Sequence, residues 1–85
     1  MKKLTSKFVK ENCYFILYDY LNDDKIIYYF DSFEELSRVF DYPCSYIVHQ
    51  FNICGSAISC IYNGFKYNLH LFIDEELVAQ NRETI

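Results

Sequence analysis

Cysteine and histidine are the residue types in this sequence that could hold a metal or act as nucleophile and base. Cys44, His49, Cys54 and Cys60 are separated by four, four and five residues, whereas a zinc knuckle needs C-x-x-C spacing. On a helix, positions five apart point to different sides, so these side chains would not converge on one ion. A Cys44 thiol paired with His49 or His70 would allow thiol chemistry, but lone residues of these types usually serve packing. We therefore expect no metal site, no cofactor and no catalytic residue.

Aspartates form the second group that could do chemistry. Asp19, Asp23 and Asp24, with Asp31 further along, carry the carboxylates that Mg²⁺ prefers. They fall where the chain is expected to reverse direction, and Asp in such places ordinarily serves the turn. The sequence has no Gly-rich phosphate loop and no G-x-S-x-G motif, and 85 residues leave little room for a sheltered substrate pocket. The sequence therefore predicts a protein that is not an enzyme.

The composition favours a surface that binds another macromolecule. Nine Tyr and eight Phe bring the aromatic share to 20%, which is more than one small core needs. Amphipathic Tyr at the edge of the core would explain this surplus, and so would a protein-binding face. The net charge is −4, and residues 19–41 hold seven acids against Lys25 and Arg38. An acidic face of this kind repels phosphate backbones and favours basic partners.

The amino end, MKKLTSKFVKEN, has the basic start of a signal peptide without the apolar segment that should follow. No apolar run reaches the ~20 residues of a membrane span. We therefore expect a cytoplasmic protein with no membrane partner. In that compartment the four cysteines are expected to be reduced, half-buried thiols without a disulfide.

Alternation and turn residues predict a β-hairpin over residues 12–30. The runs CYFILYDY (13–20) and KIIYYF (25–30) are aromatic and β-branched, and the residues between them include Asn and Asp, which accept turn conformations. Both faces of 13–20 are apolar, which suggests a strand covered on both sides. Residues 1–11 before it form a basic amino-terminal segment.

A pair of short helices in a helix-turn-helix-like arrangement is predicted over 32–54. Asp31 or Ser32, each followed three residues later by Glu, provides a capping box, and the single proline ends the first helix. Ser45 can cap the second helix, although residues 45–54 would suit a strand equally well.

A second hairpin is predicted over 57–73, because Asn63-Gly64 joins two alternating runs and favours a tight type I′ turn. Asp74 can cap a short helix or tail over 74–85. The whole order predicts a single α+β domain spanning 1–85. It would be two-layered and winged-helix-like, with antiparallel strands packing one face against the helix pair.

The chain resembles a known kind of small protein between residues 28 and 73. The order FDSFEELSRVFDYPCSYIVHQFN, a spacer and then YNGFKYNLHLF is similar to small proteins of phages and mobile elements of low-GC bacteria. It is also similar to the modular DNA-binding domains associated with homing endonucleases. The resemblance implies a helix-turn-helix-like module. The phage proteins imply an anti-CRISPR-like role, and a phage-encoded protein would act in the cytoplasm of the host cell. In a helix-turn-helix the second helix enters the major groove. The DNA contacts would then fall to Tyr46, His49, Gln50, Asn52 and Lys66.

Charge argues against direct DNA binding. The segment from Cys44 to Gly55 contains no Lys or Arg, whereas DNA affinity usually comes from neutralising ~6 to 10 phosphates. Only a tail formed by Lys2 to Lys10 would add cations. A DNA-binding accessory or regulatory protein is therefore the alternative interpretation.

The favoured interpretation is a non-catalytic protein-binding module that inhibits a host defence protein. Carboxylates would take the place of phosphates, and aromatic rings the place of stacked bases, in a nucleic-acid-binding channel such as that of a nuclease. A second alternative is a structural homodimer whose aromatics meet across a two-fold axis. The partner-binding residues are predicted to be aromatic anchors within an acidic rim: Tyr18, Tyr20, Tyr28, Tyr29, Asp23, Asp24, Glu34, Glu35 and Asp41.

Overall fold

The computed structural model describes residues 3–55 and 57–83, with side chains described as far as Ala79. The described elements run in the order α1 (Ser6–Asn12), β1 (Cys13–Asp19), a 3₁₀ turn (Tyr20–Asn22), β2 (Lys25–Phe30), α2 (Phe33–Val39), α3 (Cys44–Cys54), β3 (Ala57–Tyr62), β4 (Phe65–Ile73) and α4 (Glu75–Glu83). The predicted α+β class is confirmed. So is the order of hairpin, helix pair and hairpin, and residues 45–54 are helical.

The basic amino-terminal segment begins the fold with a helix that the sequence did not predict. Thr5 caps α1, since its Oγ1 accepts a hydrogen bond from the Phe8 amide (3.1 Å). A helix of seven residues is marginal alone, and α1 is held by tertiary contacts. Val9 is fully buried in the core and Phe8 packs against it. Two adjacent apolar residues give too little periodicity for such a helix to be recognised in the sequence.

The two hairpins form one antiparallel sheet with the strand order β2-β1-β4-β3. β1 is central and pairs with β4 from Cys13 opposite Ile73 to Tyr18 opposite Asn68. On its other side β1 pairs with β2, where the register shifts and Ile27 is the extra residue of a β-bulge.

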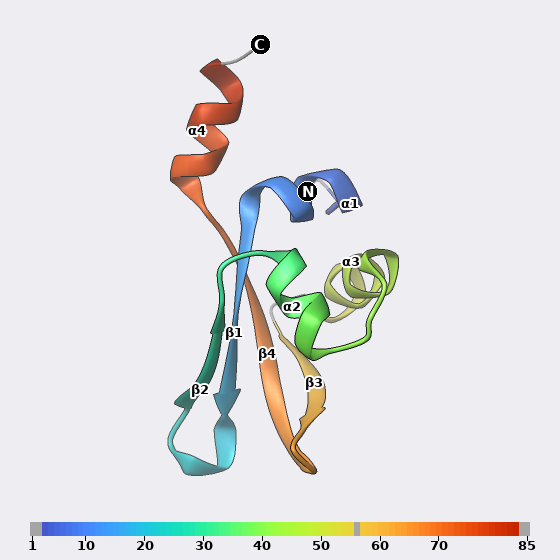
Figure 1. Ribbon diagram of the computed structural model, residues 1–85, viewed down its shortest axis with the longest axis vertical. Coiled ribbons are helices and arrows are strands. Elements are labelled where there is room, and N and C mark those ends of the chain that lie inside the picture. The colour runs from blue at the N-terminus through green and yellow to red at the C-terminus, as the bar shows by residue number, and fades with distance from the viewer. Residues whose placement is uncertain (1–2, 56, 84–85) are drawn as a thin grey trace.

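The core lies between one face of this sheet and the helices α1, α2 and α3, which lie together on that side (Figure 1). Both hairpin turns project beyond the helices, and α4 extends from the opposite end of β4 (Figure 1). Since strand side chains alternate between faces, β1 sends Phe15 and Leu17 into the core and Tyr14, Ile16 and Tyr18 to the opposite face. The prediction of a strand covered on both sides was wrong. The core is made of these buried residues: Val9, Cys13, Phe15, Leu17, Phe30, Phe33, Leu36, Phe40, Cys44, Ile47, Phe51, Ile58, Cys60 and Leu69.

The turns follow the predicted chemistry. Asn63 and Gly64 have φ values of 52° and 82°, as a type I′ hairpin requires. Asp23 and Asp24 also adopt positive φ, 58° and 54°, in the turn between β1 and β2. Gly55 ends α3 with φ 87°, and its amide donates to the Phe51 carbonyl. Within the described residues, no helix is long and apolar enough to cross a bilayer.

Candidate functional site

The sheet face opposite α1, α2 and α3 is not covered by any of these helices. We define the open face as the side chains that the strand registers place there: Tyr14, Ile16, Tyr18, Ile26, Tyr29, Ala57, Ser59, Ile61, Lys66, Asn68, His70 and Phe72. None of these side chains is buried, whereas the buried residues of the same strands all lie on the helix side. An uncovered antiparallel sheet face is ordinarily polar, and this one is predominantly aromatic and aliphatic.

Five rings on this face form a continuous row across β2, β1 and β4. The ring of Tyr14 stacks on Phe72 (centroids 5.2 Å apart, planes at 15°) and contacts Tyr29 at 5.6 Å. His70 continues the row from Phe72 at 6.3 Å and meets the ring of Tyr18 edge-on at 4.9 Å. We call these five residues the aromatic row. They offer a partly exposed, largely apolar surface that also carries hydroxyl groups and ring nitrogens.

Carboxylates lie at both ends of the aromatic row. At one end Tyr18, His70 and Asp24 line a hollow of about 260 Å³. At the other end the pKa of Tyr29 is raised, first by desolvation and then by the negative charges of neighbouring groups: Asp31, Tyr14, Asp74 and Glu35. The carboxylates among these groups, at this end of the row, are those of Asp31, Asp74 and Glu35.

Cations are scarce on the open face. Lys66 is its single Lys or Arg, and its strand neighbour across the ladder is Ile61 on β3 rather than a residue of the aromatic row. Lys3, Lys7 and Lys10 are exposed on the amino-terminal segment and α1, on the helix side of the sheet. The electrostatic character of the aromatic row is therefore set by carboxylates.

The predicted aromatic anchors are divided between the two sides of the sheet. Tyr18 and Tyr29 belong to the aromatic row. Tyr28 lies on the helix side, where its ring stacks on Phe30 at 4.4 Å. Tyr20 is exposed in the 3₁₀ turn at the hairpin end. The structure thus brings two of the four anchors together.

The predicted acidic rim is also dispersed. Asp23 and Asp24 form the β1–β2 turn, Asp41 is exposed after α2, and Glu34 and Glu35 lie in the first turn of α2. Of the rim residues, Asp24 lines the hollow beside the aromatic row, and Glu35 acts electrostatically on Tyr29.

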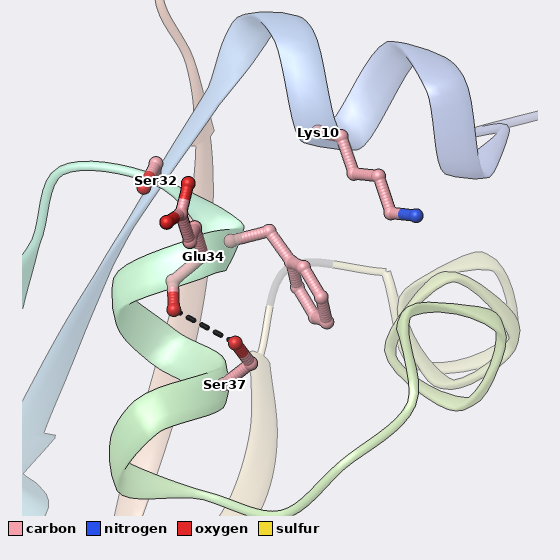
Figure 2. A pocket seen from close by; sticks show the side chains of 5 residues that line it. Lys10, Ser32, Glu34 and Ser37 are labelled. Carbon is pink, nitrogen blue, oxygen red and sulfur yellow. Dashed lines mark hydrogen bonds between the residues drawn. The ribbon is translucent and has the colours of Figure 1, made fainter.

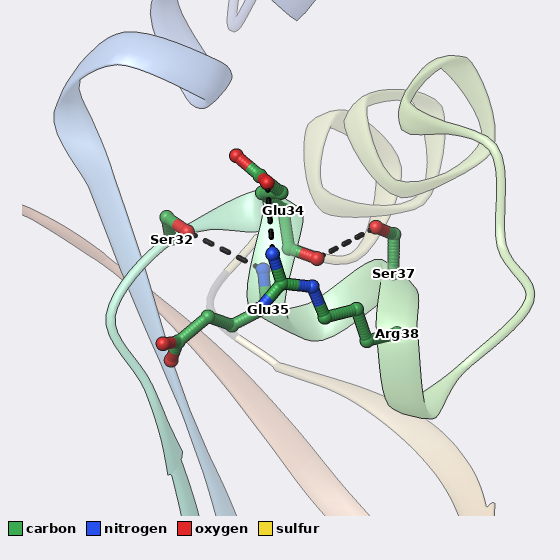
Figure 3. Close-up of polar contacts among 5 residues, drawn as sticks. All are labelled: Ser32, Glu34, Glu35, Ser37 and Arg38. Carbon is green, nitrogen blue, oxygen red and sulfur yellow. Dashed lines mark hydrogen bonds and ion pairs between the residues drawn. The ribbon is translucent and has the colours of Figure 1, made fainter.

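The two glutamates of α2 have local partners (Figure 3). Ser32 Oγ accepts from the Glu35 amide (3.3 Å), and Glu35 Oε2 accepts from the Asp31 amide (3.0 Å), so the predicted cap forms with Ser32 as its first residue. Glu34 forms an exposed ion pair with Arg38 at 3.0 Å. Glu35 therefore has a structural role in addition to its charge, whereas Glu34 is partly neutralised at the surface.

A second hollow, of about 350 Å³, lies between α1 and α2 (Figure 2). Lys10, Ser32, Phe33, Glu34 and Ser37 line it. Both hydroxyls are engaged in the helix, since Ser32 Oγ caps α2 and Ser37 Oγ donates to the Glu34 carbonyl (2.7 Å). These contacts give the hollow no activated nucleophile.

The residues predicted for DNA contact do not form one surface. Tyr46 and His49 are exposed on α3, and Gln50 is half-buried there. The Asn52 amide is occupied: Oδ1 accepts from the Leu4 amide (2.8 Å) and Nδ2 donates to the Leu4 carbonyl (3.1 Å). Lys66 points to the open face, on the other side of the sheet from α3.

The thiols are mostly packed away. Cys13, Cys44 and Cys60 are buried and Cys54 is exposed, and all four are free. Burial, and after it the charge of Cys44, raises the pKa of Cys13 to about 11. Burial also raises the pKa of Cys60 to about 11, against a lowering hydrogen bond with Tyr42. Three of the four thiols thus behave as the small hydrophobes that the sequence predicted. Across residues 3–55 and 57–83, no group of three His, Cys, Asp or Glu side chains is placed to hold a metal ion.

No family model, no curated protein and no solved structure matches this chain at a significant level. The resemblance to phage proteins and homing-endonuclease modules therefore stays a prediction.

The sequence did not identify Tyr14 and Phe72 as site residues, and it suggested His70 only as a partner for the Cys44 thiol. Their alternation with core residues is visible, and it places Tyr14 with Tyr18, and His70 with Phe72, on common strand faces. The missing information was that β1 and β4 are neighbours, which puts Tyr14 opposite Phe72 and Ile16 opposite His70. That pairing joins residues more than fifty positions apart, and no local signal specifies it.

Proposed function

We propose that this protein is a non-catalytic protein-binding module whose contact surface is the open face. The observation that carries the proposal is the aromatic row, an uncovered run of five rings with carboxylates at both ends. Large apolar rings exposed together on one face are typical of macromolecular contact surfaces, where aromatic anchors supply most of the binding energy.

The partner surface is a cationic one, rich in Arg or Lys. A guanidinium or ammonium group is attracted to the face of an aromatic ring and pairs with a neighbouring carboxylate. The hollow between Tyr18, His70 and Asp24 offers both kinds of contact within one site. The net charge of −4 adds a long-range attraction for such a partner.

Charge separates this proposal from single-stranded nucleic acid binding. Proteins that stack bases on sheet aromatics also surround the rings with cations that hold the phosphates. The open face has Lys66 alone for that purpose, and the acids near Tyr29 and Tyr18 would repel a phosphate backbone. A basic polypeptide satisfies both features of the face, its rings and its carboxylates.

The finer form of the proposal is that the partner's cationic surface is itself a nucleic-acid-binding channel, as in a host defence nuclease. A small acidic protein bound there would exclude the nucleic acid by competition. This form is supported by the combination of stacked rings and carboxylates, which imitates the bases and phosphates that such a channel receives.

The proposal is tested by titrating the isotope-labelled protein with an oligo-arginine peptide and following its amide resonances. We expect the shifted resonances to map to β1, β2 and β4, and the affinity to fall as salt rises, because the contact is partly electrostatic. Tyr18→Ala should weaken binding at least about fivefold by removing one ring and one wall of the hollow.

Tyr46→Ala is the control, because it also removes a solvent-accessible tyrosine ring, but from α3 on the helix side. Its affinity should equal that of the unmodified chain. A single-stranded DNA oligonucleotide that bound more tightly than oligo-arginine, or shifts confined to α3, would refute the proposal. For the finer form, a partner captured with the unmodified chain and not with Tyr18→Ala should lose its nucleic-acid binding when this protein is added.

A further inference from the structure

The strand order leaves two sheet edges, and they differ in their protection against pairing with another strand. β2 forms one edge and β3 the other. An exposed edge presents unpaired backbone amides and carbonyls that can template another strand. Natural edges are usually blunted by charges, prolines or bulges. The β2 edge follows this rule: it begins with Lys25, it is followed by Asp31, and Ile27 bulges it.

The β3 edge has none of these devices. Ala57–Tyr62, AISCIY, contains no charged residue, no proline and no glycine. Its register with β4 runs without interruption from Ala57 opposite His70 to Tyr62 opposite Phe65. Ile61 is 60% exposed on this edge strand. An uncharged, regular and partly apolar edge strand in an acidic protein is suited to pairing.

We propose that β3 pairs with the β3 strand of a second copy of this chain, antiparallel about a two-fold axis at Ser59. The two four-stranded sheets then form one continuous sheet of eight strands, with the two open faces on the same side. This inference does not depend on the nature of the partner bound by the open face.

A second copy fits this edge because the strand is self-complementary about Ser59. In an antiparallel pair, directly opposite side chains lie on the same face of the sheet. With Ser59 opposite its own copy, Ala57 lies opposite Ile61, a small residue against a large one, on the open-face side. Ile58 lies opposite Cys60 on the helix side, so apolar residues meet apolar residues there.

Charge also permits self-association at this edge. The acids that give the chain its net charge of −4 lie in other segments, and β3 contributes none of them. Two acidic copies therefore approach each other at their least charged strand. Pairing of two short strands buries less than the ~1,600 Å² of a standard interface, so we expect a weak dimer that forms as concentration rises.

Sedimentation equilibrium from ~10 µM to 1 mM, the range suited to a small interface, tests the dimer. Ser59→Lys should raise the dissociation constant at least about tenfold, because two like charges would face each other across the axis. Tyr18→Ala, on the aromatic row, should dimerise as the unmodified chain does. A chain that stays monomeric at the highest concentration would overturn the proposal. So would a dimer that survives Ser59→Lys or is lost in Tyr18→Ala, since the latter indicates face-to-face contact.

Disulfide trapping tests the register with different variants, both made with Cys54→Ser to remove the exposed thiol. Across the axis the two Ser59→Cys positions have Cα atoms ~4.5 to 5.5 Å apart, which a disulfide spans. The two Ile61→Cys positions are offset by four residues, or ~13 Å, and cannot be bridged. Under mild copper–phenanthroline oxidation, Ser59→Cys should form covalent dimer much faster than Ile61→Cys. Equal rates would indicate random collision and would contradict the two-fold pairing at Ser59.

Discussion

Several polar side chains in this protein have structural roles that their charge or residue type alone does not predict. Asn52 is of a residue type that can recognise a DNA base. Its side-chain amide instead forms hydrogen bonds with the backbone amide and carbonyl of Leu4, which hold the amino end against α3. Glu35 could be taken for an ordinary surface acid. Its carboxylate instead accepts a hydrogen bond from the Asp31 amide and so completes the cap of α2. Of the two adjacent glutamates, Glu34 is therefore the one that can be altered without loosening the helix start, since its ion pair with Arg38 is exposed.

The two buried thiols with raised pKa values predict a loss of stability at alkaline pH. The folded chain holds the Cys13 and Cys60 protons up to a pKa of about 11, whereas the unfolded chain releases them near 9.0. The contribution of these two thiols to the free energy of unfolding is therefore fully present below pH 9. It is lost as pH rises from 9 to 11, by roughly 2 kcal/mol for each thiol. Urea unfolding across this range measures the slope.

Other groups titrate in the same range, so the comparison with variants decides the origin of the slope. The double variant Cys13→Ala with Cys60→Ala should be less stable at neutral pH and show a shallower alkaline decline. Cys54→Ser, which removes the exposed thiol, should show the same decline as the unmodified chain. An unchanged slope in the double variant would rule out these thiols as its cause.

Among the secondary-structure elements, the sequence predicted those features that depend on interactions between residues close together in the chain. The capping serine of α2 and the Asn63-Gly64 turn were predictable from the sequence, because each depends on residues within four positions. The prediction that Ser45 caps the second helix was wrong, since α3 begins after Pro43 without a side-chain cap hydrogen bond. Helix α1 was not readable, because its stability comes from burying Val9 against the rest of the core. The aromatic row could not be predicted either, since it requires the long-range pairing of β1 with β4.

The first hairpin turn predicts a simple stabilisation. Asp23 and Asp24 adopt positive φ, a conformation that costs a non-glycine residue on the order of 1 kcal/mol. Asp24→Gly should therefore raise the free energy of unfolding by about 0.5 kcal/mol, as measured by thermal or urea denaturation. Asn22→Gly, two residues earlier in the 3₁₀ turn and without positive φ, should instead lower the free energy of unfolding. Equal effects of the two substitutions would mean that the strained φ is relieved elsewhere.

At the scale of the whole molecule, helices cover one face of the sheet only, so we expect the backbone amides to differ in their protection from hydrogen exchange. β1 and β4 have strands on both sides and carry most core residues of the sheet. α4 follows Asp74, whose amide donates to the Asn12 carbonyl (2.7 Å), and α4 also contacts α1. Stability in such a molecule decreases from the central strands outward.

Amide hydrogen exchange should resolve this gradient. We expect the slowest exchange in β1 and β4, at rates set by global unfolding, and exchange at least about tenfold faster in α4. At high protein concentration the β3 amides should also slow if two copies pair there, whereas those of β2 should not change. Slow exchange throughout α4 would show that this helix belongs to the cooperative core.

The pairing of β1 with β4 has a consequence for how the binding surface fails. Side chains alternate along a strand, so sliding β4 by a single position would drive Asn68 and His70 inward and push Leu69 out into water. Such a shift would bury polar side chains and expose a core leucine, so the aromatic row is not expected to exist in a partly shifted register. Heating should therefore abolish recognition and tertiary order in the same transition, and a sample that still folds should be fully competent.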